Sequence, residues 1–165
     1  MKKNVYIDFD GVLGLFDTTK SIEEVAKPGY SLTVPLMKEM CNAVKMLKED
    51  DTLSKEFNFK LLSAAIALHA EQDKTQVLRE EFDDRFADDA VFVQYGTSKS
   101  QYAEGGNILI DDFSPNLHEW EAAGGIGIKV YNGINGNHGT WTGYSVHSKA
   151  KPEVIYRTIK GFLTT

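Results

Sequence analysis

The sequence predicts an α/β domain built around a largely parallel sheet. Short apolar segments typical of buried strands alternate along the chain with longer amphipathic segments typical of helices. Two of the apolar segments end directly on carboxylates, at Asp8 and Asp111, and ligands bind at the carboxyl ends of the strands in open α/β sheets. The 165 residues fit one domain, 1–165, and a hydrophobic share of 42% is enough to form a core.

Five segments have the apolar character of buried parallel strands. The first runs into Asp10 and Gly11, a dipeptide typical of turns. The third is followed by a polar loop that contains Lys99, and the fourth stops at the pair Asp111 and Asp112. The predicted strands are 4–9, 57–63, 91–93, 107–110 and 126–131.

Four segments have the periodicity of helices. In the first, Leu36, Met40, Val44 and Leu47 recur every three or four residues. The third is expected to begin with Ser114 as its N-cap and to end at two glycines. The predicted helices are 33–49, 71–87, 114–123 and 152–162.

The composition excludes several classes of protein. Acidic residues outnumber basic ones by 24 to 18, which argues against binding a nucleic acid polymer or an anionic membrane. Cys41 is the only cysteine, so an internal disulfide or a cysteine-rich zinc site is excluded. No apolar run approaches the length that spans a bilayer, and Lys2 and Lys3 precede too short a stretch for a signal peptide. We expect a cytoplasmic monomer or homodimer without a membrane segment.

Four carboxylates follow strand ends and indicate a metal site. Asp8 and Asp10 are two residues apart, and Asp111 and Asp112 end a wholly apolar strand. Carboxylates gathered at neighbouring strand ends repel one another unless a cation lies among them. Oxygen ligands of this kind suit Mg²⁺ better than zinc.

The spacing of these residues resembles that of the haloacid dehalogenase superfamily. Its first motif matches D-F-D-G-V from Asp8, and its fourth, an acidic pair after an apolar strand, matches I-L-I-D-D at Asp111 and Asp112. Its second motif resembles L-L-S at Ser63, and its lysine motif resembles G-T-S-K at Lys99. The resemblance implies a three-layer Rossmann-like core with a mainly parallel sheet. It also implies a small helical cap, placed at 14–55, inserted after the first strand.

Within that superfamily the chain looks like the 5'(3')-deoxyribonucleotidase group. The supporting residues are Phe16, eight positions after Asp8, and the stretch I-L-I-D-D-F-S-P-N. In that group an aromatic residue at the position of Phe16 helps to form the nucleobase pocket. Members of the group are longer, so a reduced cap is expected here.

The resemblance implies a Mg²⁺-dependent phosphomonoesterase that acts on (deoxy)nucleoside 5'-monophosphates through an aspartyl-phosphate. The implied roles are nucleophile for Asp8, general acid and base for Asp10, and phosphate binding for Ser63 and Lys99. Mg²⁺ would be held by Asp8, the backbone carbonyl of Asp10, and the acidic pair, in which we expect Asp112 to contact the ion directly and Asp111 to support it.

Other interpretations stay open at this point. The same core serves phosphatases of sugar phosphates and other small metabolites, and a receiver-like phospho-acceptor module also gathers carboxylates and a lysine around Mg²⁺. A catalytically silent binding protein is a third possibility. Ser63 could simply be a strand-end hydrogen-bonding residue, Phe16 a packing residue and Lys74 a surface lysine, while His138 could approach a substrate.

Overall fold

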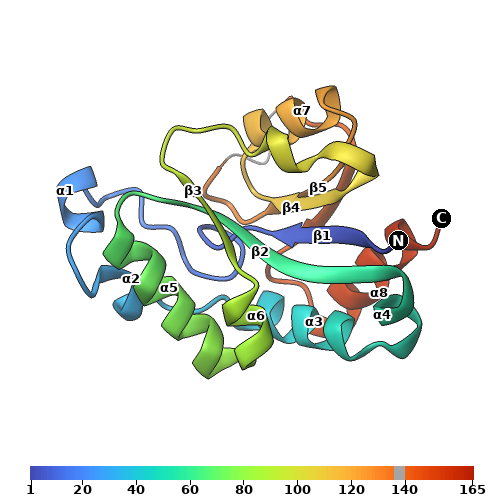
Figure 1. The fold of residues 1–165 in the computed structure, drawn as a ribbon, viewed down its shortest axis with the longest axis horizontal. Coiled ribbons are helices and arrows are strands. Elements are labelled where there is room, and N and C mark those ends of the chain that lie inside the picture. The colour runs from blue at the N-terminus through green and yellow to red at the C-terminus, as the bar shows by residue number, and fades with distance from the viewer. Residues whose placement is uncertain (136–139) are drawn as a thin grey trace.

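The computed structural model describes residues 1–135 and 140–165, and His138 lies outside them. The described residues form a six-stranded sheet in which every neighbouring pair of strands is parallel (Figure 1). The strand order is β3-β2-β1-β4-β5-β6, so the predicted α/β class is confirmed. The strands are β1 (Lys3–Ile7), β2 (Phe57–Ala65), β3 (Val91–Gln94), β4 (Ile108–Asp111), β5 (Ile126–Tyr131) and β6 (Tyr144–His147).

Helices cover both faces of the sheet and give the three layers that the sequence predicts. In Figure 1, α7 lies above the sheet, while α3, α4, α5, α6 and α8 lie below it. None of the helices in residues 1–135 and 140–165 combines the length and hydrophobicity needed to cross a bilayer. The helices are α1 (Ile22–Val25), α2 (Tyr30–Thr33), α3 (Lys38–Glu49), α4 (Asp51–Glu56), α5 (Leu68–Glu81), α6 (Asp84–Asp88), α7 (Ser114–Ala122) and α8 (Pro152–Leu163).

Strand alternation divides the core into two clusters, one for each face of the sheet. On β1, Val5 and Ile7 point to the cluster formed with the lower helices, whereas Tyr6 packs in the cluster that contains Trp120 of α7. The side chains that form both clusters are almost fully buried. The sheet is therefore held between two apolar layers, and its carboxyl edge is the edge that carries the predicted site.

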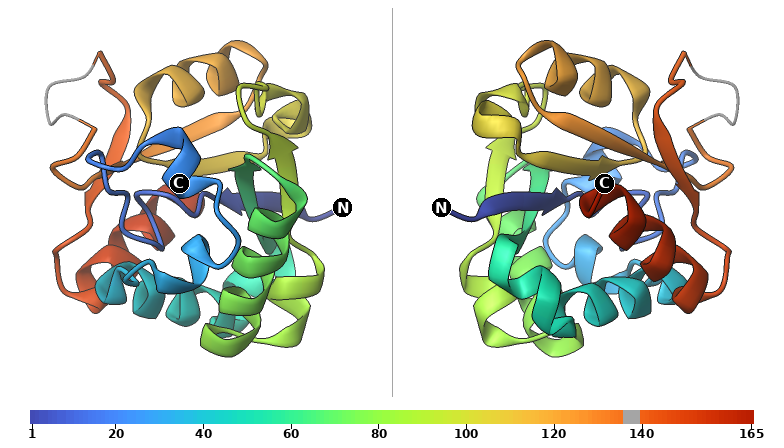
Figure 2. Two further views of the ribbon diagram at one scale, coloured as in Figure 1. Left: turned by 90° about the vertical axis from the view of Figure 1, so that its left-hand side faces the viewer. Right: turned by 90° about the vertical axis from the view of Figure 1, so that its right-hand side faces the viewer.

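Helix α3 belongs to the lower core layer. Its buried residues include Met40, Val44 and Leu47, which join the same cluster as Val5, and the helix packs against α8. By contrast, α1 and α2 lie beside the carboxyl edge of the sheet (Figures 1 and 2). The segment 14–55 thus contains a part that covers the edge and a part that packs in the core.

Two predicted helices are each interrupted. The helix predicted at 33–49 is broken because α2 ends at Thr33 and α3 begins at Lys38, with extended backbone between them around Pro35. The helix predicted at 71–87 is two helices, because Asp83 takes extended geometry and caps α6 by accepting the backbone N–H of Phe86 at 2.7 Å.

Two further differences lie in the C-terminal half. Ser114 is the first residue of α7, not its N-cap, and its hydroxyl accepts a hydrogen bond from Lys129 at 2.7 Å. Strand β6 has no counterpart among the predicted strands, because it is only four residues long and follows a glycine-rich stretch.

Asp50 joins the α3–α4 junction to α8. Its carboxylate accepts hydrogen bonds from Lys160 and from the Tyr156 hydroxyl, both at 2.6 Å, and from the backbone N–H of Leu53 at 3.0 Å. Donation by Lys160, then by Tyr156 and Leu53, lowers the pKa of Asp50 below its ordinary value. A carboxyl of this kind stabilises the fold above its unfolded pKa of about 3.9 and loses that contribution as the pH falls through its folded pKa.

The variant Asp50→Asn is therefore expected to melt at a lower temperature than the parent at neutral pH, and the difference should shrink as the pH falls below about 4. Thermal unfolding of both proteins across this range measures it, with Asp51→Asn on the exposed start of α4 as control. An equal difference at neutral and acidic pH would contradict the ionic role of Asp50.

Candidate active site

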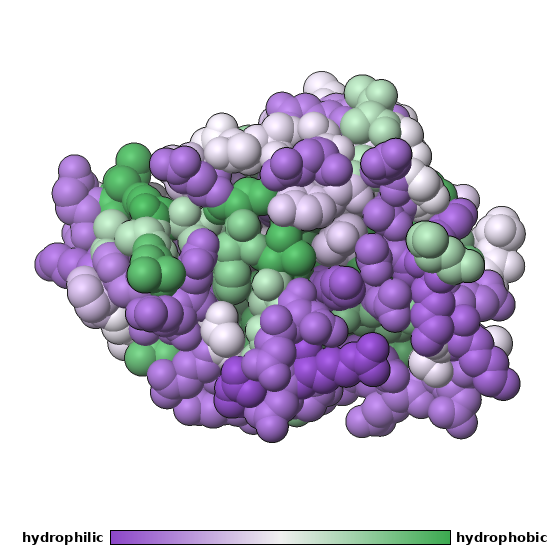
Figure 3. Space-filling model, in the orientation of Figure 1, coloured by the Kyte–Doolittle hydropathy of each residue, from purple (hydrophilic) through white to green (hydrophobic). Residues whose placement is uncertain are grey.

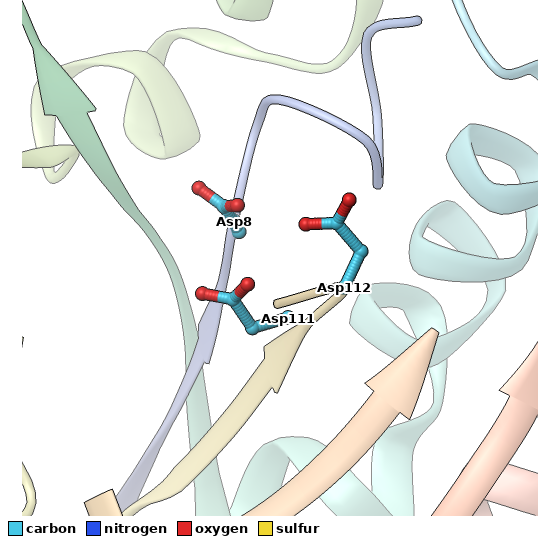
Figure 4. A group of neighbouring side chains, drawn as sticks. All are labelled: Asp8, Asp111 and Asp112. Carbon is cyan, nitrogen blue, oxygen red and sulfur yellow. The ribbon is translucent and has the colours of Figure 1, made fainter. Parts of the chain in front are cut away.

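Three buried carboxylates meet at the carboxyl ends of β1 and β4. The two strands pair in register, with Ile7 opposite Ile110, and the backbone N–H of Asp8 continues the pairing to the carbonyl of Ile110 at 3.0 Å. This brings Asp8 beside Asp111 and Asp112, and one oxygen from each carboxylate lies within 4.8 Å of the others. Figure 4 shows the three side chains gathered at these strand ends.

Lys99 lies against this cluster, as the sequence predicts. Its ammonium group is 2.9 Å from Asp8 Oδ1 and 2.8 Å from Asp111 Oδ2, and only 5% of its side chain is exposed. Burial opposes the charged form, but the Asp111 and Asp8 carboxylates outweigh it and raise the pKa of Lys99 above its ordinary value. Lys99 is thus a fixed positive charge between two of the three carboxylates.

A second lysine holds Asp10 and Ser63 together. Lys74 of α5 donates to Asp10 Oδ2 at 2.8 Å, to Ser63 Oγ at 3.1 Å and to the carbonyl of Ala64 at 3.0 Å. All three ammonium protons have an acceptor. Ser63 is fully buried, whereas 41% of the Asp10 side chain is exposed. The expectation that Lys74 is a surface lysine is therefore wrong.

The two members of the acidic pair have different surroundings. The carboxylate of Asp111 accepts hydrogen bonds from Lys99, from the side chain of Asn116 at 3.1 Å and from the backbone N–H of Phe113 at 2.9 Å. Asp112 instead accepts two amide N–H groups on one oxygen, Oδ2, from Asn132 at 2.9 Å and Asn135 at 2.5 Å.

The turn after Asp10 approaches Asp112 so closely that only glycine fits. Gly11 has a φ of +80°, and a Cβ at this position would lie 2.0 Å from Asp112 Oδ2 and 2.9 Å from Asn132 Nδ2. The backbone carbonyl of Gly11 also accepts a hydrogen bond from Asn132 at 2.8 Å. The glycine of the D-F-D-G-V motif is therefore required both by the turn and by the neighbouring carboxylate.

The buried carboxylates carry an electrostatic cost without a cation. Burial, and then repulsion from Asp111, raises the pKa of Asp8 well above its ordinary value and raises the pKa of Asp112 to about 7. The cluster offers three carboxylates, whose hard oxygen donors are those that Mg²⁺ prefers. The donor set therefore fits Mg²⁺.

Stabilisation by Mg²⁺ is expected to grow with pH. Because the folded pKa of Asp112 is raised, the metal-free folded protein binds its proton more tightly than the unfolded chain does. The metal-free protein then loses stability as the pH rises from about 4 to about 7. Mg²⁺ binds the ionised carboxylates, so it should raise the melting temperature more at about pH 8 than at about pH 6.

Thermal melts with MgCl₂ and with KCl at matched ionic strength measure this effect. In Asp112→Asn, which cannot ionise at this position, the pH dependence should shrink to the part that Asp8 contributes, because the pKa of Asp8 is raised as well. A Mg²⁺-induced shift that is equal at both pH values would contradict the assignment of the raised pKa.

Several polar residues of the site escape sequence reasoning. Lys74 shares the buried stripe of α5 with Ala70 and Leu78, at four-residue spacing, so a lysine on an apolar helical stripe is the signal that could have identified it. Lys129 gives a similar signal, since it interrupts the apolar strand β5 and is 1% exposed. Asn132 and Asn135 give no signal beyond a turn-rich sequence.

Phe16 lies on a hollow beside the site, not among the carboxylates. The hollow has a volume of about 350 Å³ and is lined by the loop after β1, by α2 and by Ile134. Phe16 is 38% exposed. Ile134 belongs to the loop whose residues Asn132 and Asn135 bond Asp112, so the hollow lies beside the buried carboxylate cluster. A smaller hollow at the opposite end of β2, lined by Lys60 and Arg85, contains none of the site residues.

Comparison with known proteins finds likeness in structure and none in sequence. No protein-family model matches the chain, and no curated protein matches it in sequence. Among solved structures, the chain is similar to the crystal structure of D,D-heptose 1,7-bisphosphate phosphatase from B. bronchiseptica complexed with magnesium and phosphate. The TM-score is 0.58 and the identity 13%, over 96% of this chain and 99% of that chain. The likeness establishes a shared three-layer Rossmann-like α/β fold.

Proposed function

We propose that this chain is a phosphomonoesterase of the haloacid dehalogenase superfamily that uses Mg²⁺ and forms an aspartyl-phosphate on Asp8. The observation that carries the proposal is the meeting of the three buried carboxylates Asp8, Asp111 and Asp112 with Lys99 at one sheet edge. The structural neighbour, a phosphatase with magnesium and phosphate bound, has the same fold. Sequence motifs and geometry therefore support the same chemistry.

Charge determines what the site can bind. A phosphate monoester brings nearly two negative charges to a place that already holds several carboxylates, so attack by a carboxylate needs compensating positive charge. Lys99 supplies one positive charge beside Asp8, and Lys74 supplies a second beside Ser63. Mg²⁺, when bound by Asp8, Asp112 and the backbone carbonyl of Asp10 with Asp111 supporting the centre, would offset two further charges on the phosphoryl oxygens.

The chain's own residues then perform two steps. In the first, an oxygen of Asp8 attacks phosphorus, the bond to the leaving oxygen breaks, and Asp10 gives its proton to the leaving alcohol. In the second, Asp10 takes a proton from water as that water attacks phosphorus, which releases phosphate and restores the Asp8 carboxylate. Asp10 suits this double role because it is two residues from Asp8 and partly exposed. A receiver-like module needs no such group.

In this proposal the two residues of the acidic pair, Asp111 and Asp112, have different roles. Asp112 would hold the cation through Oδ1, because its other oxygen accepts hydrogen bonds from two amides. Asp111 supports the centre, because its oxygens accept from Lys99, Asn116 and a backbone N–H.

Lys74 is proposed as a positioning residue for Asp10. Replacing it with methionine should leave the carboxylate of Asp10 without its ionic partner and slow phosphate release from a nucleotide by about 100-fold, within the range ascribed to acid–base catalysis. The rate of phosphate release from a substrate such as p-nitrophenyl phosphate, whose leaving group needs no proton, should fall much less. Lys45→Met, which removes an ion pair with Glu81 outside the site, is the matched control. Equal losses on both substrates would contradict this role.

The cap is proposed to be smaller than 14–55 and to comprise residues 15–37. These residues include α1 and α2 and line the hollow around Phe16. The cap is tied to α5, because Asp73 accepts the backbone N–H of Gly29 at 2.7 Å and His69 contacts the carbonyl of Ala26. Figure 3 shows hydrophobic residues at the end of the molecule where α1 lies. A cap of this size leaves room for a small leaving group.

We assign the leaving group to the (deoxy)nucleoside class because of the residues that line this hollow. Phe16 and Tyr30 offer aromatic surfaces to a flat base, with Ile134 beside them. The second candidate is a sugar phosphate, which the activity named for the structural neighbour favours. Phosphate release from a panel of deoxynucleoside and ribonucleoside 5'-monophosphates and sugar phosphates, with Mg²⁺ and with chelator, separates the two.

Preferred release from deoxynucleotides, reduced in Phe16→Ala, would support the nucleotide assignment. Preferred release from sugar phosphates, unchanged in Phe16→Ala, would retain the phosphatase chemistry and overturn the nucleotide assignment.

A further inference from the structure

Two amide side chains from the loop after β5 bind the same oxygen of Asp112. The distances from Asp112 Oδ2 are 2.9 Å to Asn132 Nδ2 and 2.5 Å to Asn135 Nδ2. Each carboxylate oxygen has two lone pairs, so two N–H donors satisfy Oδ2. Neither asparagine is needed for the chemical steps described above.

The direction of the Asn132 amide is fixed by its surroundings. Its Oδ1 accepts the backbone N–H of Ile134 at 2.8 Å and that of Asn135 at 3.2 Å. Its Nδ2 also donates to the backbone carbonyl of Gly11 at 2.8 Å. The amide therefore cannot rotate by half a turn without losing every one of these hydrogen bonds, and its N–H groups must face Asp112 and Gly11.

The same loop is also anchored by Lys129. Lys129, buried in β5, donates to the hydroxyl of Ser114 at 2.7 Å and approaches the carbonyl of Asn135 at 3.4 Å. Since Ser114 follows Asp112 by two residues, the lysine connects the start of α7 to the asparagine loop. Lys129 thus connects the two segments that flank Asp112, namely the start of α7 and the asparagine loop.

We propose that Asn132 and Asn135 are positioning residues that restrict Asp112 to binding a cation through one oxygen, and that they thereby make the centre selective for Mg²⁺ over Ca²⁺. The inference rests on the proposed function, in which this cluster holds a divalent cation. Mg²⁺ requires near-octahedral geometry with short bonds, whereas Ca²⁺ accepts bidentate carboxylates and a larger number of ligands. A carboxylate whose second oxygen is already bonded cannot become bidentate without displacing two amides.

The test is titration calorimetry of the full chain with MgCl₂ and separately with CaCl₂. The variants are Asn135→Ala, which removes one donor to Asp112, and the double variant Asn132→Ala with Asn135→Ala, which removes both. Asn58→Ala is the matched control, because Asn58 bonds Asn4 near the start of β1 and β2. Circular dichroism of each variant establishes that the fold is kept. If the double variant does not fold, Asn135→Ala alone still tests the inference.

The parent is expected to prefer Mg²⁺. Loss of outer-shell partners of a metal ligand weakens binding by about 10- to 100-fold, so the double variant should lose Mg²⁺ affinity on that scale. Ca²⁺ affinity should fall less, because the released oxygen becomes an additional ligand for it. The ratio of the two affinities should therefore shift toward Ca²⁺ by about tenfold, with a smaller shift in Asn135→Ala and none in the control.

Two results would overturn the inference, and they are distinguishable. If the parent binds Mg²⁺ and the variants keep its ratio of Mg²⁺ to Ca²⁺ affinity, the asparagines do not set selectivity, and the proposed function stands. If the parent binds neither cation, the proposed metal centre fails, and the inference fails with it.

Discussion

Replacing Asp8 with asparagine is expected to abolish phosphate release, with a loss of about 10,000-fold or more, the scale seen when a covalent nucleophile is removed. The reason is chemical, since a neutral amide cannot form the acyl-phosphate bond. The fold should survive, because asparagine has nearly the same shape and Lys99 keeps Asp111 as its partner. Initial rates with Mg²⁺ and a preferred substrate measure the effect.

Stability provides the internal control for this variant. Asp8 is buried beside Asp111, and its pKa is raised by burial and by that repulsion, so removing the charge should leave the metal-free melting temperature unchanged or higher. Asp51→Asn, on the exposed start of α4, should change neither activity nor melting temperature appreciably. Retained activity in Asp8→Asn would contradict the nucleophile assignment.

Replacing Lys99 with methionine is expected to damage both activity and stability. Its ammonium group lies within 3 Å of two buried carboxylates, and removing one partner of a buried ion pair costs about 3–5 kcal/mol because the remaining charge is left without compensation. The same loss should slow phosphate release by about 100-fold or more, the cost of removing one charge-stabilising group from an active site.

Mg²⁺ should restore part of the stability of Lys99→Met, because a bound cation would again compensate Asp8 and Asp111. Chemical denaturation with and without Mg²⁺ measures the loss of stability and its partial recovery, and initial rates of phosphate release measure the loss of activity. Lys55→Met, at the end of α4, is the control. A variant as stable as the parent in chelator would show that Lys99 is not the charge that balances this cluster.

The part of the site that the sequence predicts is the part fixed by strand ends. Asp8 and Asp111 each follow an apolar strand, and parallel pairing of β1 with β4 is enough to bring them together. Lys99 follows β3 by only a few residues and reaches the same edge. For these residues, the local sequence pattern together with parallel strand pairing is enough to predict that they lie close together.

The parts that the sequence does not predict depend on packing between distant elements. Lys74 reaches Asp10 only because α5 lies beneath β2, and the position of Asn132 is set by where β5 ends relative to the turn at Gly11. The division of 71–87 into α5 and α6 is set by one cap, Asp83, in a run of acidic residues where several could serve. The four-residue spacing on α5 marks Lys74 as buried but does not identify Asp10 as its partner, and the other contacts have no periodic signature.

The measurement that tests the central proposal most directly is identification of the phosphorylated residue. The protein is mixed with Mg²⁺ and substrate, quenched in acid during turnover, reduced with borohydride and digested for mass spectrometry. An acyl-phosphate on a carboxylate is reduced to an alcohol, so the proposal predicts homoserine at position 8, present only with Mg²⁺ and substrate. Reduction at another aspartate, or turnover with no reduced residue, would contradict the assignment of Asp8 as the covalent nucleophile.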